Sequence, residues 1–502
     1  MSLAPRETAP LGAGTGLEEL LDGVREFAQA EIDARTPVPD VPLTGSGVSA
    51  IEQAAVAAGL LDDEPGGTGL WAGDAERAQF SVLALRILAR SSAAAALHLH
   101  NTALARRVCN TLWDCEAAPG TTLTLTGRLG LPGAALGRWL AGHELDADDH
   151  SVLADAYGGR ERIRWTTARD NRWITARYAT DGDGAGTMTL SVFAGGGEEL
   201  PAAHGLDGLA AIRQPAAAPE RSEPVDPATL SELLFAQQLG VVAVAQGATD
   251  AALRLARAYA VARRQGGGPI IAHDAVALML ADAAGAQQTV AGGVSGILAG
   301  TGPARDLAAV VDLRRAALPA LRTAVDHAMQ VHGGIGYMRD TGVEHRWRDL
   351  GSLSVLAGTP DQLGLLSAAL RMPGAARHEP GDLGAGDRIA GHVSPMAVLA
   401  LQPALRRQPL LRATAAYRPE DPWERDTRDL PRALRALRRE LRDFAATHIE
   451  PLALQTDRAG IDSGTRPAQI DALMVTAGRA GLLGDMLPRP VGSGSVARYR
   501  SL

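Results

Sequence analysis

The sequence predicts an α+β fold in which a helical region, a β region and a second helical region follow one another. Ala and Leu recur at helical spacing early in the chain, as in QFSVLALRILARSSAAAALHLHNTALARRV. Short alternating runs such as TTLTLTG, RIRWTT and GTMTLSVFA come next, and long helical patterns then return. We therefore expect a helical domain over residues 1–118, a β-domain over residues 119–228 and a helical bundle domain over residues 229–373.

Beyond these regions the sequence predicts a linker and a repeated segment. Residues 374–425 are rich in Pro, Gly and Arg, as linkers often are. LRDFAATHIE, from Leu441, repeats VREFAQAEID at an offset of 417 residues, and IDALMVTAGRAGLLGD, from Ile470, repeats a segment near residue 50 at an offset of 422. We expect residues 426–502 to be a partial second copy of the N-terminal helical domain. The alternative is that two amphipathic helices coincide by composition.

Composition excludes several classes of function. The net charge is −8 without a basic stretch, so we expect no nucleic-acid partner. All 49 basic residues are arginine, which excludes a lysine Schiff base and a P-loop lysine. Cys109 and Cys115 fit no zinc spacing, and His98 and His100 point to different helix faces, so we expect no metal site. With neither a secretory signal nor a membrane-spanning apolar run visible, we expect a cytoplasmic protein without membrane contact.

Motifs in the second helical region resemble the C-terminal signature of the acyl-CoA dehydrogenases. ARRQGGGPIIAHD is similar to the family's Arg-x-Gln-Phe-Gly-x-Pro-Ile, although Gly266 replaces the phenylalanine. QVHGGIGY, HRWRDL and GTPDQ follow in the family's order. The resemblance covers roughly residues 15–372. It implies an acyl-CoA dehydrogenase-like fold with an N-terminal helical domain, a middle β-domain and a C-terminal four-helix bundle, to which the repeated helical segment is added.

The resemblance implies FAD as the cofactor. In the family, the Arg-x-Gln-Phe-Gly and Gln-x-x-Gly-Gly segments reach across a subunit interface to the adenosine and pyrophosphate of the neighbour's FAD. Glycines let a backbone approach a phosphate, and arginine neutralises its charge, although a helix-ending turn also explains the glycines taken alone. The candidate cofactor-binding residues are Arg263, His273, Gln330, Gly333, Gly334 and Thr359.

The family's catalytic base is missing from both of its usual positions. Family members carry a glutamate either just before the Gly-Thr or on a helix of the C-terminal domain, and these positions align with Ala357 and Gln237. Neither a methyl group nor an amide can take the substrate's α-proton, a step that a positioned base accelerates roughly 10²–10⁴-fold. Asp361 is the nearest carboxylate, and a capping or solvated role is its favoured interpretation. We therefore assign no catalytic residue.

The flavin-side motif of the β-domain is also altered. The family's Trp/Tyr-Ile-Thr-Asn aligns with the four residues Arg162, Ile163, Arg164 and Trp165, so only the isoleucine is kept. Two arginines would disturb a flat apolar slot for the flavin ring. A shift in register would instead place Trp165 or Trp173 against the ring.

These observations favour a non-catalytic subunit that completes the FAD site of a partner acyl-CoA dehydrogenase. Such a chain would form a homo- or hetero-oligomer with a dehydrogenase homologue. One alternative is an active FAD-dependent dehydrogenase or oxidase of acyl-CoA or carrier-bound acyl groups, with a base not yet located. The other is a structural or acyl-CoA-binding remnant without FAD.

Overall fold

The computed structural model divides into two compact units, Met1–Leu401 and Gln402–Leu502. The first unit carries the helical and sheet regions, and the second carries the repeated segment. The structure describes residues 16–36, 41–62, 69–72, 75–127, 130–158, 162–180, 186–299, 306–371, 432–453, 468–480 and 482.

The N-terminal region of the first unit consists of helices around an apolar core. They are α1 (Leu17–Phe27), the π-helical turn η1 (Ala28–Ile32), η2 (Asp33–Arg35), α2 (Gly45–Ala57), α3 (Ala75–Ser91) and α4 (Ala93–Trp113). Helix α4 begins after Ser92, whose side chain accepts a hydrogen bond from the backbone N–H of Ala95. It ends at Asp114, which has a left-handed φ of 48°. Helix α1 and η1 pack on α3, and α2 packs on α4.

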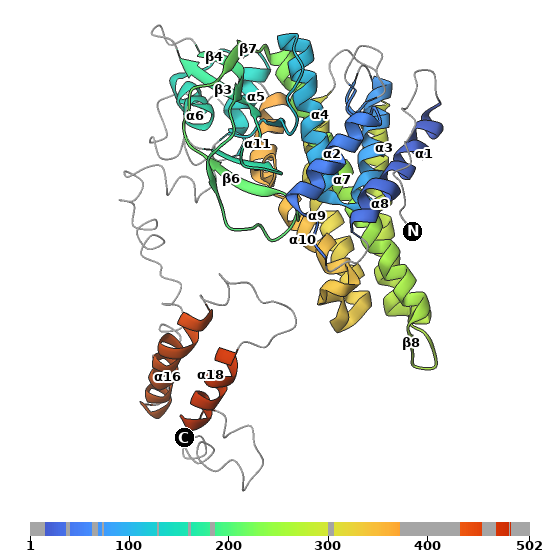
Figure 1. Ribbon diagram of the computed structural model, residues 1–502, viewed down its shortest axis with the longest axis vertical. Helices are drawn as coiled ribbons and strands as arrows, with labels where there is room; N and C mark the ends of the chain where they lie inside the picture. Colours follow the sequence, from blue (N-terminus) through green and yellow to red (C-terminus); the bar gives the residue numbers. More distant parts are fainter. Residues whose placement is uncertain are drawn as a thin grey trace. The chain divides into compact units, whose positions relative to one another are not determined.

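Two small sheets follow the N-terminal helices (Figure 1). The first has the order β1-β3-β4-β7, with β1 parallel to β3 and the other pairs antiparallel, and the second has the order β2-β6-β5. In the register of β3 and β4, Trp173 lies opposite Phe193 and their rings stack at 4.9 Å. The strands are β1 (Thr122–Thr124), β2 (Arg162–Thr166), β3 (Trp173–Thr180), β4 (Gly186–Phe193), β5 (Glu198–Glu199), β6 (Ala210–Gln214) and β7 (Arg221–Pro224).

The β region also contains two helices, α5 (Gly133–Leu140) and α6 (Ala147–Tyr157), that the sequence patterns did not predict. Helix α6 begins after Asp146, whose side chain accepts a hydrogen bond from the backbone N–H of Asp149. Both helices are short, so their apolar residues show too few turns to reveal a helical period.

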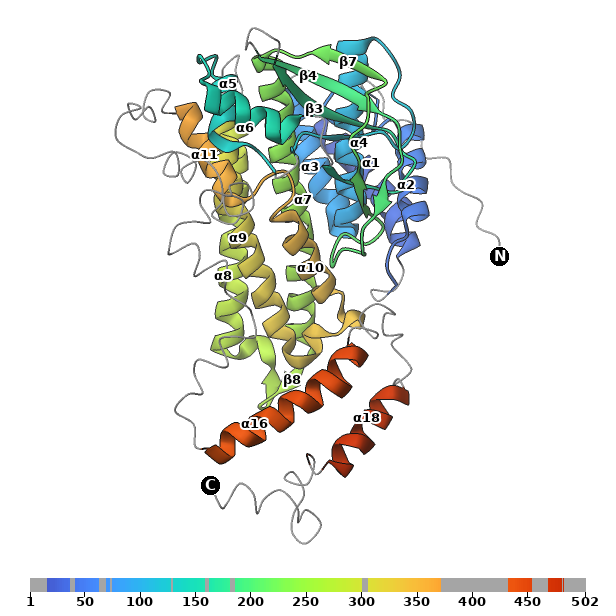
Figure 2. The same ribbon diagram turned by 90° about the vertical axis from the view of Figure 1, so that its left-hand side faces the viewer.

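The second helical region is a bundle built on one long helix (Figure 2). Its helices are α7 (Pro227–Ala262), α8 (Asp274–Leu298), α9 (Leu307–His332), α10 (Val343–Leu353) and α11 (Pro360–Arg371). By length and composition α7 could cross a membrane, since its best window has mean hydropathy 1.4, but 78% of that window is buried inside the protein. Helix α7 packs against α3, α4, α8, α9 and α10, so it is the central core helix.

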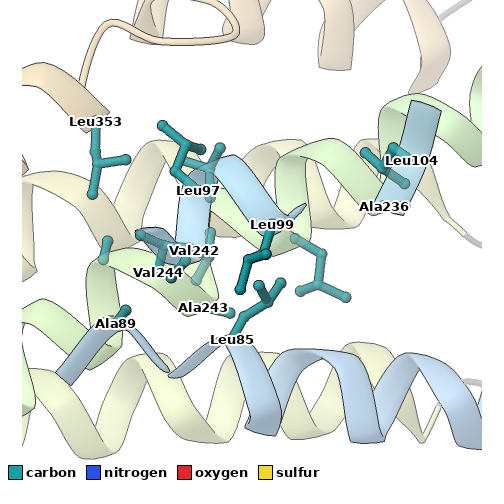
Figure 3. Packing of buried hydrophobic residues seen from close by; sticks show 14 of the residues in the cluster. Leu85, Ala89, Leu97, Leu99, Leu104, Ala236, Val242, Ala243, Val244 and Leu353 are labelled. Atoms are coloured by element: carbon teal, nitrogen blue, oxygen red, sulfur yellow. The ribbon is translucent and has the colours of Figure 1, made fainter. Parts of the chain in front are cut away.

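Small residues let these helices approach closely (Figure 3). Leu85 from α3, Leu99 from α4 and Ala243 from α7 meet in one apolar cluster. A side chain at Gly240 would collide with the buried ring of His100, so this crossing of α4 and α7 requires glycine. The first unit is therefore held together by helix packing around α7.

The second unit repeats the local geometry of the chain's first two helices. Its helices are α16 (Arg432–Phe444), the π-helical turn η7 (Ala445–Ile449) and α18 (Ala468–Arg479). Helix α16 changes from α to π winding 417 residues after α1 does. At the end of α18 the backbone N–H of Leu482 donates to the carbonyl oxygen of Ala477 over 3.0 Å. At the end of α2, 422 residues earlier, the backbone N–H of Leu60 donates to the carbonyl oxygen of Ala55 over 2.9 Å.

Both structural offsets equal the offsets of the sequence repeat. Because π-helical residues are rare, well under about 1% of residues in globular proteins, a π turn in the same register is poorly explained by composition alone. We call α1–η1–α2 the first copy and α16–η7–α18 the second copy.

Candidate functional site

The structure brings the family's two base positions into one region. The side-chain N–H of Gln238, near the start of α7, donates to the backbone carbonyl of Ala357 over 3.0 Å. Its neighbour Gln237 is 4% exposed, and its side-chain oxygen has no hydrogen-bond partner in the described part of the chain. Ala357 and Gln237, the two positions predicted to lack a proton acceptor, therefore belong to the same region of the fold.

A fully buried arginine, Arg314 of α9, holds the loop between α10 and α11 in this region. Its guanidinium donates to the carbonyl oxygens of Ala357 at 3.0 Å, Gly358 at 3.3 Å and Leu353 at 3.5 Å. It also donates to the carbonyl of Leu356 and to the side-chain oxygen of Gln238. Burial lowers the pKa of Arg314 to about 9, so the group is a cation at neutral pH.

These contacts explain how the loop keeps an unfavourable backbone. Ala357 has a φ of 57°, a left-handed conformation that costs a non-glycine residue roughly 1–2 kcal/mol. The hydrogen bonds from Arg314 to the loop offset that cost. Sequence reasoning missed Arg314, and the available signal was a charged residue at an inward position of an otherwise apolar helical stretch, VVDLRRAAL.

Within the described part of the chain, the side chains that hydrogen-bond to Ala357 include no carboxylate. Asp361 is exposed in the first turn of α11, where its charge favours the helix N-terminus, in agreement with the predicted capping or solvated role. The groups that hold Ala357 are an amide and a guanidinium, neither of which accepts a proton at neutral pH.

The altered flavin-side motif lies on strand β2, and its arginines point into the β-domain. Arg162 is 4% exposed and donates to the carbonyls of Ala176 and Tyr157 and to Thr175. Arg164 is fully buried and donates to backbone carbonyls, including that of Gly196 at 3.2 Å.

The buried side of β2 therefore offers little to a flavin ring, because it is filled by arginines whose hydrogen bonds are made within the β-domain. Ile163 and Trp165 lie on the other side, where Ile163 is 49% exposed and Trp165 is half-buried. Burial lowers the pKa of both Arg162 and Arg164 to about 10, so both remain charged at neutral pH.

Most of the predicted cofactor-binding residues gather at the far end of the bundle. Arg263 is exposed and follows α7, and the hairpin of β8 (Arg264–Gln265) and β9 (Gly268–Pro269) projects there (Figure 2). His273, exposed at the start of α8, donates to the carbonyl of Gln265 over 3.1 Å. The hairpin turns at Gly266 and Gly267, whose φ values of 61° and 90° account for glycine where the family has phenylalanine.

The end of α9 lies beside the end of α7 in this region. The rings of Tyr259 on α7 and His332 on α9 stack at 4.7 Å. Gln330 is exposed and accepts a backbone hydrogen bond from Gly333, which ends the helix with a φ of 64°. A side chain added at Gly333 or Gly334 would meet nothing, so both backbones are open to a ligand. We call this end of the bundle, with Arg263, His273, Gln330, Gly333 and Gly334, the bundle tip.

Thr359, the sixth predicted residue, lies elsewhere. It is two residues after Ala357, which contacts Gln238 of α7. Gln238 is 25 residues before Arg263, so the two positions are about 37 Å apart along α7. Its backbone N–H donates to the side chain of Gln362 over 3.0 Å, and its hydroxyl accepts from the Gln362 N–H over 3.4 Å. This reciprocal pair, with Pro360 at the first helical position, is a capping box for α11. Thr359 and the bundle tip therefore cannot line one small pocket within one chain.

Two further features of the helical region lie apart from these sites. His98 and His100 are both buried and have different partners, a Glu52 carboxylate at 2.7 Å and the Trp71 indole N–H at 2.8 Å. Cavities of about 230 Å³ and 210 Å³ lie between α3, α7 and α8 and between α4 and α7. Neither cavity is lined by Ala357 or by a residue of β2.

The arrangement defines an acyl-CoA dehydrogenase fold. Solved structures with this arrangement include a glutaryl-coenzyme A dehydrogenase in complex with glutaryl-CoA (TM-score 0.55, 18% identity, 73% of this chain and 97% of that chain). Others are butyryl-CoA dehydrogenase from Megasphaera elsdenii (0.50, 16%, 72% and 100%) and the prolyl acyl carrier protein oxidase AnaB (0.53, 13%, 71% and 98%). At these identities the likeness establishes the fold.

The family match lies in the bundle. Residues 230–369 match the family described as acyl-CoA dehydrogenase, C-terminal domain, so the match covers this domain of the chain. No curated protein matches the chain.

Proposed function

We propose that this chain is a non-catalytic subunit that completes the FAD site of a partner acyl-CoA dehydrogenase in the cytoplasm. The observation that carries the proposal is the contrast between the two ends of α7. Near Ala357 the described side chains that bond to the loop are an amide and the guanidinium of Arg314, neither of which accepts a proton. The bundle tip instead keeps an exposed arginine beside open glycine backbone.

The residues present fit FAD at the tip and not at the chain's own ring slot. A guanidinium and unobstructed backbone suit a pyrophosphate, so Arg263 would neutralise its charge while Gly333 and Gly334 allow close approach. On β2, in contrast, the side chains of Arg162 and Arg164 fill the buried face and make their hydrogen bonds internally. FAD, when bound, would supply hydride acceptance, and this chain would contribute only binding contacts.

Exposed apolar side chains at the tip support its role as an interface. Tyr337 is 74% exposed, Leu278 62%, Met338 57%, Val261 56% and Ile335 47%. Apolar groups gathered at one end of a bundle are typical of a protein contact. The acyl-CoA or carrier-bound acyl substrate would then bind to the partner, which also provides the base.

The test compares the flavin content of this chain alone with that of the complex it forms with a co-expressed acyl-CoA dehydrogenase homologue. We expect a colourless isolated chain and a yellow, active complex. Replacing Arg263→Ala should lower FAD retention at least several-fold without unfolding the chain, because one charged pyrophosphate contact is lost. Arg257→Ala, an exposed arginine about 9 Å earlier on α7, is the matched control and should leave FAD retention unchanged.

Two results would contradict the proposal. Stoichiometric FAD in the isolated chain, with turnover of an acyl thioester, would assign it to the working flavoenzymes. Unchanged FAD retention in the Arg263→Ala complex would remove the tip from the cofactor site.

A further inference from the structure

The second copy presents an apolar face that its counterpart in the first copy buries. In the first copy Val24, Phe27, Ile32, Val48, Ile51, Ala55 and Leu60 are each 2% exposed or less. At offsets of 417 and 422 residues they correspond to Leu441, Phe444, Ile449, Ile470, Leu473, Ala477 and Leu482, which we call the repeat face. Leu441 is 39% exposed and Ile449 is 43% exposed, and most of the others are partly exposed.

The first copy indicates what covers such a face. Its helices bury the equivalent residues against α3 and α4 of the first unit. The backbone geometry that aims these residues, including the π turn and the hydrogen bond that ends the second helix, is the same in both copies. The repeat face is thus shaped for a helix pair of the α3–α4 type.

A core position that changes from charged to apolar between the copies indicates that the receiving pair is not the one in this chain. Glu52 is 5% exposed and binds His98 of α4, whereas the corresponding residue of the second copy is Met474. A methionine opposite His98 would leave a buried histidine without its carboxylate, which is unfavourable.

We propose that the second copy docks on an α3–α4-type helix pair of another acyl-CoA dehydrogenase-fold chain, with an apolar residue at the position of His98. The receiving pair would lack its own cover, because the second copy takes the place that α1 and α2 occupy here. The docking surface is apolar and helical and involves neither the bundle tip nor FAD. It therefore stands or fails separately from the proposed cofactor role.

The test is a chimera of the full-length chain in which the second copy replaces the first copy and packs on α3 and α4. Residues 434–484 replace residues 17–62, with His98 kept in one chimera and His98→Leu in the other. Thermal unfolding is followed by circular dichroism. We expect His98→Leu to raise the midpoint of the chimera by roughly 5 °C and to lower that of the natural chain by a similar amount, because Met474 favours an apolar neighbour and Glu52 does not.

Matched variants show whether the repeat face makes the contact. Phe444→Asp in the chimera should abolish the cooperative transition, whereas Ala446→Asp, two residues further on at an exposed position, should leave the midpoint unchanged. Failure of both chimeras to unfold cooperatively, or equal effects of the two aspartates, would overturn the proposal. A cooperative chimera that His98→Leu does not stabilise would assign the face to a second copy of this chain, which also overturns the proposed occupant.

Discussion

Helix α7 connects two regions of opposite character. Near its start, Gln238 and Arg314 fill the space beside Ala357, and both side chains donate hydrogen bonds to its carbonyl oxygen. Beyond its end, Arg263 and the glycines after α9 are exposed, and so are the apolar side chains of Tyr337 and Met338. One continuous helix therefore joins a closed interior to an exposed surface.

Under the proposed function, the difference illustrates how a fold loses a catalytic group and keeps a binding surface. A catalytic base requires one particular group at one position, so a single replacement such as Ala357 removes it. A binding surface depends on several weaker contacts and survives the loss of one of them. Packing around α7 keeps the tip in place whether or not the opposite end of the helix can react.

The largest effect should come from the closed end. Replacing Arg314→Met removes all hydrogen bonds from the guanidinium to the loop and leaves buried carbonyls without donors. We expect the free energy of unfolding in denaturant to fall by about 3–5 kcal/mol. Arg315→Met, at the next and 44% exposed residue, should change it by about 0.5 kcal/mol or less. Similar losses in the two variants would mean that Arg314 does not hold the loop.

A smaller effect on the free energy of unfolding should appear when His100, at the crossing of α4 and α7, is protonated at low pH. Burial lowers the pKa of His100 from 6.5 to about 4, so the folded chain keeps this ring neutral. The stability it contributes is complete above pH 6.5 and is lost as the pH falls from 6.5 through 4, by about 3 kcal/mol. His100→Gln, whose amide oxygen can still accept from Trp71, should flatten this part of the curve of unfolding free energy against pH. An unchanged slope would exclude His100 as the titrating group.

The smallest effect should come from the tip. Tyr337 is 74% exposed, so Tyr337→Ser should leave the free energy of unfolding of the isolated chain within about 0.5 kcal/mol of its original value. The same substitution should weaken association with the partner dehydrogenase, measured by analytical ultracentrifugation of the mixed proteins. Destabilisation of the isolated chain by more than about 1 kcal/mol would show that the tip is part of the core, and the contrast between the two ends would fail.

Much of this organisation is encoded in local sequence signals. The order of helical, strand and helical patterns indicated the α+β class, and ARRQGGGPIIAHD with QVHGGIGY pointed to the C-terminal domain family that residues 230–369 match. The repeat was visible because similar local patterns fold into similar local geometry, down to a π turn. GTPDQ, interpreted as a cofactor motif, also forms a capping box, and its FAD contact remains a prediction.

Sequence alone determined which residue types occupy the family's positions, above all that Ala357 and Gln237 cannot act as a base. Only the tertiary structure decided what those positions face, because burial and hydrogen bonding depend on residues far apart in the chain. Arg314 meets Ala357 across 43 residues, and Tyr259 on α7 meets His332 on α9. The local sequence pattern does not indicate such tertiary contacts, because they form only when the helices pack together.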